Sequence, residues 1–371
     1  MENIYRRIKI INQKCKVDLN NLVARYKFNP LLKSSEVNKI WDSSHLKVVT
    51  VHNAGVIEYE EKVLMLFRSH LRNGISVIGL AESKNGVDKW KIFPKPVIKP
   101  CTRNDVFYEG VDIEECIISE RGGCEDPRIS KIGDTFYITY SAYHASIKNR
   151  VRVSLITTKD FISYVRHGAL MDIDMRNVVI FPEKIDNKFF ALFRPNDSTK
   201  GDVGGIFKQI LIGNTDNILE KKWNINQTPI INQLGGPSAF ADKIGPGATP
   251  IKSKYGWINI FHGVRNTMDG NPYVLGVAIH DLENPEKVKV ANIPILFPTK
   301  SDCKVKSTDY VHVPNVVFCC GALRKSNGEL YIYYGGNDTV MNLCVTHEDI
   351  LFELCQNFPQ DPNNGTYAYE L

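Results

Sequence analysis

The sequence lacks any run of about 18 apolar residues, the length that a membrane-spanning helix requires. Its first 21 residues, MENIYRRIKIINQKCKVDLNN, also lack an apolar stretch of signal-peptide length. We therefore expect a cytoplasmic protein with no membrane partner.

Cysteine motifs are missing as well. The nine cysteines are scattered along the chain and no CxxC pair occurs, so neither a zinc site nor a disulfide framework is indicated. We expect buried, reduced thiols, no bound metal and no cofactor.

A strong charge of one sign is the third absence. Lysine and arginine number 46 against 41 acidic residues, which leaves a net charge of +5. This excess is too small to make nucleic acid the expected partner. An anionic small ligand would require several positive side chains to converge on one site.

What the sequence does contain is one strand pattern that occurs five times. Each copy is an apolar and aromatic segment that ends in a polar or small residue, which is typical of strands in hairpins. The five copies lie at 63–68, 135–141, 188–194, 256–263 and 329–336. Each follows another expected strand, beginning near 53, 125, 178, 247 and 315, and precedes a third strand; the third strand at 204–217 is the weakest.

Five cycles of antiparallel strands predict an all-β fold. No single cycle can bury a core alone, but radial packing around a central axis would provide one. We expect a five-bladed β-propeller over residues 25–371, the catalytic domain, after a short helical or irregular N-terminal extension over 1–24. A large β-sandwich is the alternative, but it gives no reason for a fivefold repeat.

Polar residues gather at one end of these strands. They occur at the start of the first strand and at the end of the second strand in each cycle, where a propeller places the mouth of its central channel. The starts are Asn53, Glu125–Asp126, Arg176–Asn177, Pro246–Gly247 and Asn315, and the ends include Arg68, Tyr140, Arg194 and His262.

The densest local signal is GGCEDPRIS at 122–130. Pro127 restricts the backbone of the preceding residue, so Asp126 is expected to be a rigidly presented carboxylate. The alternative is a turn aspartate that bonds its own backbone. Glu125 is expected to be a buried partner of Arg128.

Three basic residues suggest an anion site. Arg176 and Arg194 bracket one expected hairpin, 175–194, so its antiparallel strands bring both to the same end. Lys252 lies on the first strand of the next cycle. Two guanidinium forks and one ammonium group suit a tetrahedral anion such as phosphate. Separate surface ion pairs are the alternative.

The chain also resembles glycoside hydrolase family 130, which comprises β-mannoside phosphorylases and some β-mannosidases. The resemblance covers roughly residues 25–350 and keeps order and spacing. It rests mainly on GGCEDPRISKIGDTFYITYSA at 122–142, VVIFPEKIDNKFFALFRP at 178–195, GPGATPIKSKYGWINIFHGV at 245–264 and NVVFCCGALRKSNGELYIYYGGNDT at 315–339. It implies a five-bladed propeller, in agreement with the repeat. Two departures are TPIK at 249–252 in place of PPIK and a longer segment at 201–246.

The resemblance also implies residue roles. The proton donor is Asp126. The sugar-contacting positions are Asn53, Arg68 and Asp338. The phosphate-binding positions are Arg176, Arg194 and Lys252, with His262 and Tyr273 closing the anion site.

The implied activity is that of an inverting β-mannoside phosphorylase. Such an enzyme cleaves β-mannosyl oligosaccharides, β-1,2- or β-1,4-linked, with inorganic phosphate and forms α-D-mannose 1-phosphate reversibly. The expected partners are the oligosaccharide and phosphate, and assembly into a homo-oligomer stays open. The alternatives are a β-mannosidase that uses water and a propeller that only binds glycans or proteins.

Several aromatic residues are candidates for stacking on sugar rings, although most aromatics in such blades form the core. His144 and His312 are expected to be structural. The aromatic candidates are Tyr108, Tyr140, Tyr143, Trp257 and Tyr310.

Overall fold

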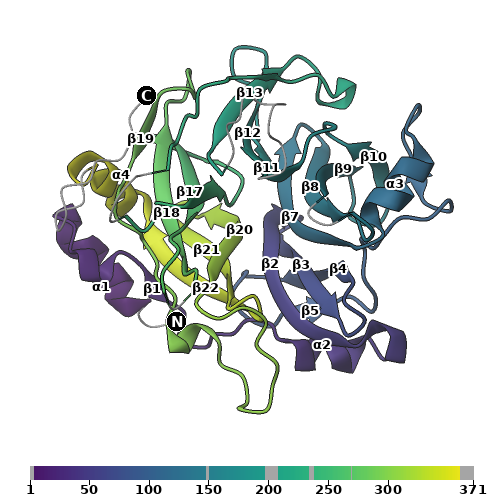
Figure 1. Cartoon of the computed structure of the whole chain (residues 1–371). Helices are drawn as coiled ribbons and strands as arrows, with labels where there is room; N and C mark the ends of the chain where they lie inside the picture. Colours follow the sequence, from purple (N-terminus) through teal and green to yellow (C-terminus); the bar gives the residue numbers. More distant parts are fainter. Residues whose placement is uncertain (1–3, 148–149, 197–207, 234–237, 269, 360–371) are drawn as a thin grey trace.

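The computed structural model describes residues 4–147, 150–196, 208–233, 238–268 and 270–359. Its described part consists mainly of antiparallel strands that form five consecutive groups, placed one after another around a common centre (Figure 1). The expectation of a mostly-β chain is confirmed.

Strand groups 1 and 2 share one hydrogen-bonded sheet. A single parallel bridge, between Ser76 and Gly123, joins them. Group 1 contains β2 (Val48–Tyr59), β3 (Lys62–Leu71), β4 (Ser76–Ser83) and β5 (Lys91–Ile92). Group 2 contains β7 (Gly123–Ile132), β8 (Thr135–Tyr143), β9 (Val151–Thr158) and β10 (Val165–Ala169), with β6 (Val106–Phe107) parallel to β10.

Groups 3 to 5 are separate sheets. Group 3 contains β11 (Met175–Ile180), β12 (Phe189–Pro195), β13 (Leu211–Thr215) and β14 (Asn224–Ile225). Group 4 contains β15 (Lys243–Pro246), β16 (Ile251–Ser253), β17 (Gly256–Val264), β18 (Tyr273–His280) and β19 (Val288–Val290). Group 5 contains β20 (Val317–Arg324), β21 (Glu329–Gly336) and β22 (Val340–His347).

The N-terminal part completes group 5. Strand β1 (Ala24–Arg25) pairs antiparallel with β22, with Ala24 opposite Val345. The expected boundary between residues 24 and 25 therefore falls inside β1. In the preceding helix, α1 (Tyr5–Cys15), the φ angles lie between 38° and 61°. Nothing in the sequence accounts for this left-handed backbone.

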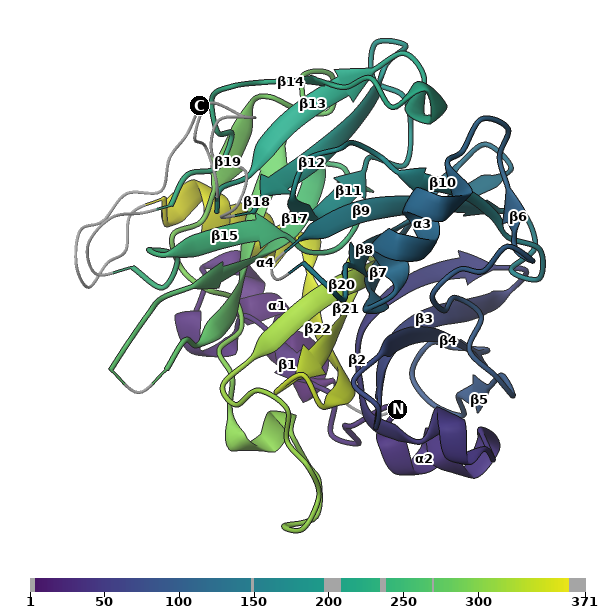
Figure 2. The ribbon, with the colours of Figure 1, turned by 45° about the vertical axis from the view of Figure 1, so that its right-hand side comes forward.

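Helices cover the outside of the sheets. Figures 1 and 2 show α1 beside α4 (Glu348–Asn357), next to group 5, and α3 (Ile113–Glu120) at the edge of group 2. Helix α2 (Ser34–Ile40) lies against group 1. The 3₁₀ turns are Leu19–Asn21, Ser44–Leu46, Ile218–Glu220 and Lys300–Asp302. In the part of the chain that the structure describes, no helix is long and apolar enough to cross a membrane.

The groups are tied together near the centre by side chains that bond a neighbour's backbone. Ser130 Oγ donates to Ile180 O at 2.6 Å, which links groups 2 and 3. Thr249 Oγ1 donates to Ile129 O at 2.9 Å, which links group 4 to group 2. Groups 5 and 1 meet at Gly321, where a Cβ atom would lie 2.6 Å from Val56 N.

Most expected strands are present. The five copies of the aromatic pattern are β3, β8, β12, β17 and β21. Each is the second strand of its group except β17, which follows two short strands, β15 and β16, that both pair with it. The expected first strand at 178–185 begins and ends earlier, as β11. Within the weak strand expected at 204–217, β13 covers 211–215, and residues 204–207 lie outside the described residues. Helix α3 was not expected, although Asp112 caps it by accepting from Glu115 N at 3.0 Å.

Candidate active site

The candidate site begins with a backbone feature that recurs in four of the five groups among the described residues. Asn53, Asp126, Asn177 and Asn315 have φ angles of 48°, 52°, 58° and 59°. Asparagine and aspartate tolerate this left-handed conformation better than other non-glycine residues. The strand register shifts beside the first three, as in β-bulges that redirect a side chain.

Asn53, Asp126 and Asn177 line a cavity of about 590 Å³, to which all five groups contribute. Eight of the nine residues expected to form the site line it. They are Asn53, Arg68, Asp126, Arg176, Arg194, His262, Tyr273 and Asp338.

Asp126 is held in place by two side chains from group 1. Its Oδ1 accepts from Asn53 Nδ2 at 2.9 Å and from Arg68 Nη1 at 3.0 Å. Arg68 also donates to Glu125 Oε1 at 2.7 Å. The predicted pair of Glu125 with Arg128 is therefore wrong, because Arg68 extends across from β3 and meets the carboxyl groups of both acids.

Charges around Asp126 favour its ionised form. Burial raises the pKa of this carboxyl, but Arg68, Arg128 and the Asn53 amide together lower it below its usual value. Burial opposes the charge of Arg68, yet Glu125 and Asp126 raise its pKa. In the unliganded pocket, Asp126 is a carboxylate paired with a guanidinium ion.

Asp338 is a second carboxyl in the cavity, and its pKa is raised where that of Asp126 is lowered. Burial raises its pKa to about 7, and the charges of Asp126 and Glu125 act in the same direction, against Arg68 and a hydrogen bond from Asn53. Asn53 thus contacts both cavity aspartates. Near neutral pH, one of these two aspartates holds a proton for much of the time and the other does not.

Arg128 connects three strand groups behind Asp126. It is buried, and it donates to Asp126 O at 2.8 Å, to Asn177 Oδ1 at 3.0 Å and to Gly247 O at 3.0 Å. A charged donor shared by three acceptors is a strong tether. The backbone of Asp126 is therefore fixed relative to the groups that carry the cations.

The cations lie at the group 3 and group 4 side of the cavity. Arg176 and Arg194 are direct cross-strand partners in β11 and β12, as the hairpin spacing predicted. Lys208 and Lys243 line the same cavity, and Lys243 Nζ lies 2.5 Å from Tyr273 Oη. Four basic side chains from groups 3 and 4 thus face the same space as Arg68 of group 1, a suitable arrangement for a multiply charged anion.

His262 and Tyr273 form an uncharged wall beside these cations. Burial, and then the charges of Arg194 and Lys243, lower the pKa of His262 well below its usual value. Gly245 allows the close approach, because a Cβ there would lie 2.6 Å from His262 Cε1 and 2.7 Å from Arg194 Cδ.

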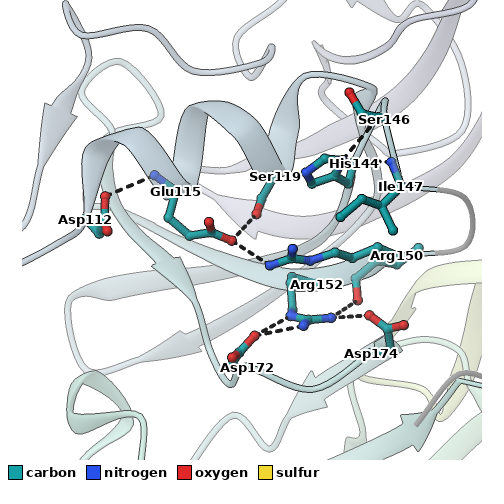
Figure 3. Close-up of polar contacts among 11 residues, drawn as sticks. Asp112, Glu115, Ser119, His144, Ser146, Ile147, Arg150, Arg152, Asp172 and Asp174 are labelled. Carbon is teal, nitrogen blue, oxygen red and sulfur yellow. Dashed lines mark hydrogen bonds and ion pairs between the residues drawn. The ribbon is translucent and has the colours of Figure 1, made fainter.

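A polar network fixes the segment that leads into Arg176 (Figure 3). Arg152 donates to Asp172 at 2.8 Å and pairs with Asp174, two residues before Arg176. On the same side, Arg150 donates to Glu115 of α3 at 2.9 Å. His144 Nδ1 accepts two backbone N–H bonds at 3.1 Å within its own loop, a structural role, as expected.

Comparison with known proteins assigns the family. The sequence model of the family described as β-1,4-mannooligosaccharide phosphorylase matches residues 19–357, more than nine-tenths of the chain. The chain belongs to glycoside hydrolase family 130. One relative in this family is the 1,2-β-oligomannan phosphorylase of Thermoanaerobacter sp. (strain X514), which is 32% identical over 75% of this chain and 81% of its own length.

Listeria innocua provides a match both in sequence and in solved structure. Its β-1,2-mannobiose phosphorylase is 27% identical over 90% of this chain and 98% of its own length. The solved structure of a β-1,2-mannobiose phosphorylase from that organism, in complex with β-1,2-mannobiose, matches with a TM-score of 0.71 at 26% identity. That match covers 90% of this chain and 99% of the solved chain.

Lys252 is the one expected site residue that lies outside the cavity in this family 130 chain. It pairs with Glu183 and its side chain is 54% exposed. The strand register gives the reason: Lys252 lies opposite Trp257, whereas Lys243 lies opposite Val264 at the cavity end of β17. Seven residues of strand separate the two positions, about 23 Å. The prediction that Lys252 belongs to the anion site was therefore wrong.

Lys243 and Lys208 are the site residues that sequence reasoning missed. Lys243 is the first residue of the first strand in group 4, and Arg176 has nearly the same place in group 3. That equivalence could have identified it. Lys208 follows a segment outside the described residues, 197–207, and gave no comparable signal.

Burial shows that two of the aromatic candidates are core residues. Tyr140 and Trp257 are core residues, 1% and 0% exposed. Among the residues that the structure places, no cluster of three His, Cys, Asp or Glu side chains is arranged to hold a metal ion.

Proposed function

We propose that this chain is an inverting β-mannoside phosphorylase, with Asp126 as the proton donor and inorganic phosphate as the nucleophile. The observation that carries the proposal is the division of one cavity into two parts. Asp126 lies with Asn53 and Arg68 from group 1, and the cations Arg176 and Lys243 lie across from them, in groups 3 and 4.

The chemistry needs one acid and no separate base. An inverting hydrolase requires a second carboxylate that activates water, but phosphate is already an anionic nucleophile. A phosphate oxygen attacks the anomeric carbon of the mannosyl unit, and the glycosidic C–O bond breaks with its electron pair on the departing oxygen. Hydrogen phosphate loses one proton and the departing oxygen gains one, so the exchange balances without a cofactor.

Asp126 and the cations have separate tasks in this scheme. Asp126 must first take up a proton, because Arg68, Arg128 and Asn53 favour its carboxylate form. It then passes this proton to the departing oxygen, and general acid catalysis of this kind contributes about 10²- to 10⁴-fold. Arg176, Arg194 and Lys243 hold phosphate beneath the anomeric carbon, with His262 and Tyr273 beside it. Positioning a second reactant contributes on the order of 7–11 kcal/mol.

Two structural assignments accompany this function. The five strand groups are the blades of a five-bladed β-propeller, supported by their order around one centre and by the family. Residues 25–371 are the catalytic domain and residues 1–24 the extension, with β1 closing the fifth blade. A cytoplasmic location and a homo-oligomeric state stay predictions.

β-1,2-Mannobiose is the first substrate to test, because the relatives that are 32% and 27% identical are named for β-1,2-linked mannosides. The purified protein is incubated with it with and without inorganic phosphate, and the products are followed by anion-exchange chromatography. We expect α-mannose 1-phosphate and mannose, and no cleavage without phosphate. Release of mannose at an equal rate without phosphate would instead establish a β-mannosidase. If neither β-1,2- nor β-1,4-mannobiose is cleaved under either condition, the alternative of a propeller that only binds glycans or proteins would be favoured.

A further inference from the structure

Inversion places strict limits on where the leaving sugar lies. The nucleophile and the leaving group are on opposite faces of the anomeric carbon. Arg176, Arg194 and Lys243 come from groups 3 and 4. A leaving sugar must therefore extend to the other side of Asp126, toward group 1 (Figure 1).

A second cavity, of about 260 Å³, lies on that side. It is formed between the turn that joins β3 to β4 and the loop that precedes β20. Its polar and aromatic lining comes from His70, Arg72, Tyr310 and His312. We call it the Tyr310 cavity. Its volume is slightly below the 300 Å³ or so at which sites for small ligands begin, so it suits one sugar unit.

The Tyr310 cavity is related to the proton donor through strand β3. Arg68, which lines the larger cavity, and His70, which lines the Tyr310 cavity, are two residues apart on β3 and therefore point to the same face. Arg68 bonds Asp126 and Glu125, and the charges of Arg68 and Glu125 act on both His70 and His312. One face of β3 thus contributes to both cavities.

The loop that carries Tyr310 is fixed to the turn that carries Asp338. His312 N donates to Thr339 Oγ1 at 3.0 Å, and Val313 N donates to Asn337 O at 3.2 Å. Asp338 lies between these two anchoring residues. Asp338 lines the larger cavity and Tyr310 the smaller one. The loop and the turn, bonded to each other, therefore contribute to both cavities.

The lining is chemically suited to a neutral sugar. Tyr310 is 53% exposed, and its hydroxyl lies 2.7 Å from His312 Nδ1. The His70 and His312 rings are 5.0 Å apart. Burial and Arg68 lower the pKa of both imidazoles, so they are neutral near pH 7. His70 Nδ1 has no hydrogen-bond partner among the described residues.

We propose that the Tyr310 cavity holds the sugar unit that leaves in phosphorolysis and that acts as acceptor in the reverse reaction, with the Tyr310 ring as its stacking surface. This assignment rests on the proposed function. It makes Tyr310 a specificity-determining residue that contacts the acceptor and not the phosphate.

Steady-state kinetics in the direction of synthesis tests the assignment, with α-mannose 1-phosphate as donor and mannose as acceptor. Tyr310→Ala should raise the KM for mannose about tenfold, the effect of one lost aromatic contact, and leave the KM for the donor within twofold. Tyr310→Phe, which keeps the ring, should retain most of the acceptor affinity. Tyr108→Ala is the matched control, because Tyr108 is 47% exposed and lies outside both cavities.

Calorimetric titration of β-1,2-mannobiose into phosphate-free enzyme gives a readout that needs no turnover. Tyr310→Ala should weaken binding by a similar factor, with an unchanged melting temperature. Weakened binding together with a wild type that phosphate does not activate would refute the proposed reaction and keep the cavity assignment. The assignment is overturned if Tyr310→Ala and His70→Ala both leave the acceptor KM and the disaccharide Kd within twofold, or if the wild type binds neither β-1,2- nor β-1,4-mannobiose.

Discussion

Arg176 and Arg194 face each other across β11 and β12 as direct partners in the strand register. Two guanidinium groups at adjacent positions repel each other, and such like-charge pairs are destabilising unless something offsets them. A bound phosphate would supply that compensation. An anion bound between Arg176 and Arg194 would therefore be stabilised by both charges.

The first prediction compares the effects of Lys243 and Lys252 on phosphate binding. Lys243→Ala should raise the KM for phosphate roughly 10- to 100-fold, because a hydrogen bond to a charged group contributes about 1.5–3 kcal/mol. Lys252→Ala is the matched control and should change it less than twofold, since Lys252 pairs with Glu183 outside the cavity. Initial rates at varied phosphate measure both. Equal effects of the two substitutions would contradict the register-based assignment.

The second prediction concerns Asp126. Asp126→Asn keeps the shape of the side chain but cannot transfer a proton, so kcat should fall by about 10²- to 10⁴-fold. Asp134→Asn, at an exposed aspartate in the turn between β7 and β8, should retain normal kcat. Single-turnover phosphorolysis provides the measurement, with circular dichroism as a check of the fold. A kcat for Asp126→Asn within threefold of the wild type would remove Asp126 as the donor.

The third prediction uses the pKa of Asp338, which is about 7 in the folded protein and about 3.9 in an unfolded chain. Between these values the folded state keeps a proton that the unfolded state has lost, so stability falls as pH rises from about 4 to 7. Asparagine has no carboxyl group and stays neutral throughout this pH range. Asp338→Asn should thus be more stable than the wild type above pH 7, by on the order of 2 kcal/mol after allowing for solvent screening.

Urea unfolding of Asp338→Asn and of the wild type at pH 5, 6, 7 and 8 checks this. The difference in the free energy of unfolding should grow with pH up to 7 and then level off. A constant difference across the range would show that Asp338 does not bind a proton preferentially in the folded state.

The fourth prediction concerns Gly245. An alanine methyl group there would overlap His262 and Arg194, and both are side chains that can move aside. Gly245→Ala should therefore raise the KM for phosphate by about tenfold or more, since small misplacement of binding groups is costly, with a limited change in melting temperature. Unaltered phosphate kinetics in a folded Gly245→Ala protein would argue against Arg194 as a phosphate ligand.

The strand order and most of the site were predictable from the sequence because both depend on local patterns. The apolar and aromatic composition of each copy identifies it as a strand, and the hairpin spacing brings Arg176 and Arg194 to the same end, where they are opposite each other. Asn53, Asp126 and Asn177, whose backbone is left-handed, were identified as strand starts because polar residues there pack poorly but suit a site.

What escaped prediction depends on register and on long-range contacts. Lys252 was selected by motif, and only the pairing of β16 with β17 shows that it lies at the wrong end of its blade. The partner of Glu125 could not be found because Arg68 comes from another group, 57 residues away. Helix α3 is short and lies between strands, so its cap was a weak signal.

The pairing of β1 with β22 has a consequence for synthesis and for truncation. Ala24 is synthesised more than 300 residues before its partner Val345. Closure of group 5, and with it the wall that carries Asp338, must wait until β22 has been made. Shortened chains that end before β22 should hence be inactive, and removal of residues 1–25 should leave an unprotected strand edge prone to aggregation.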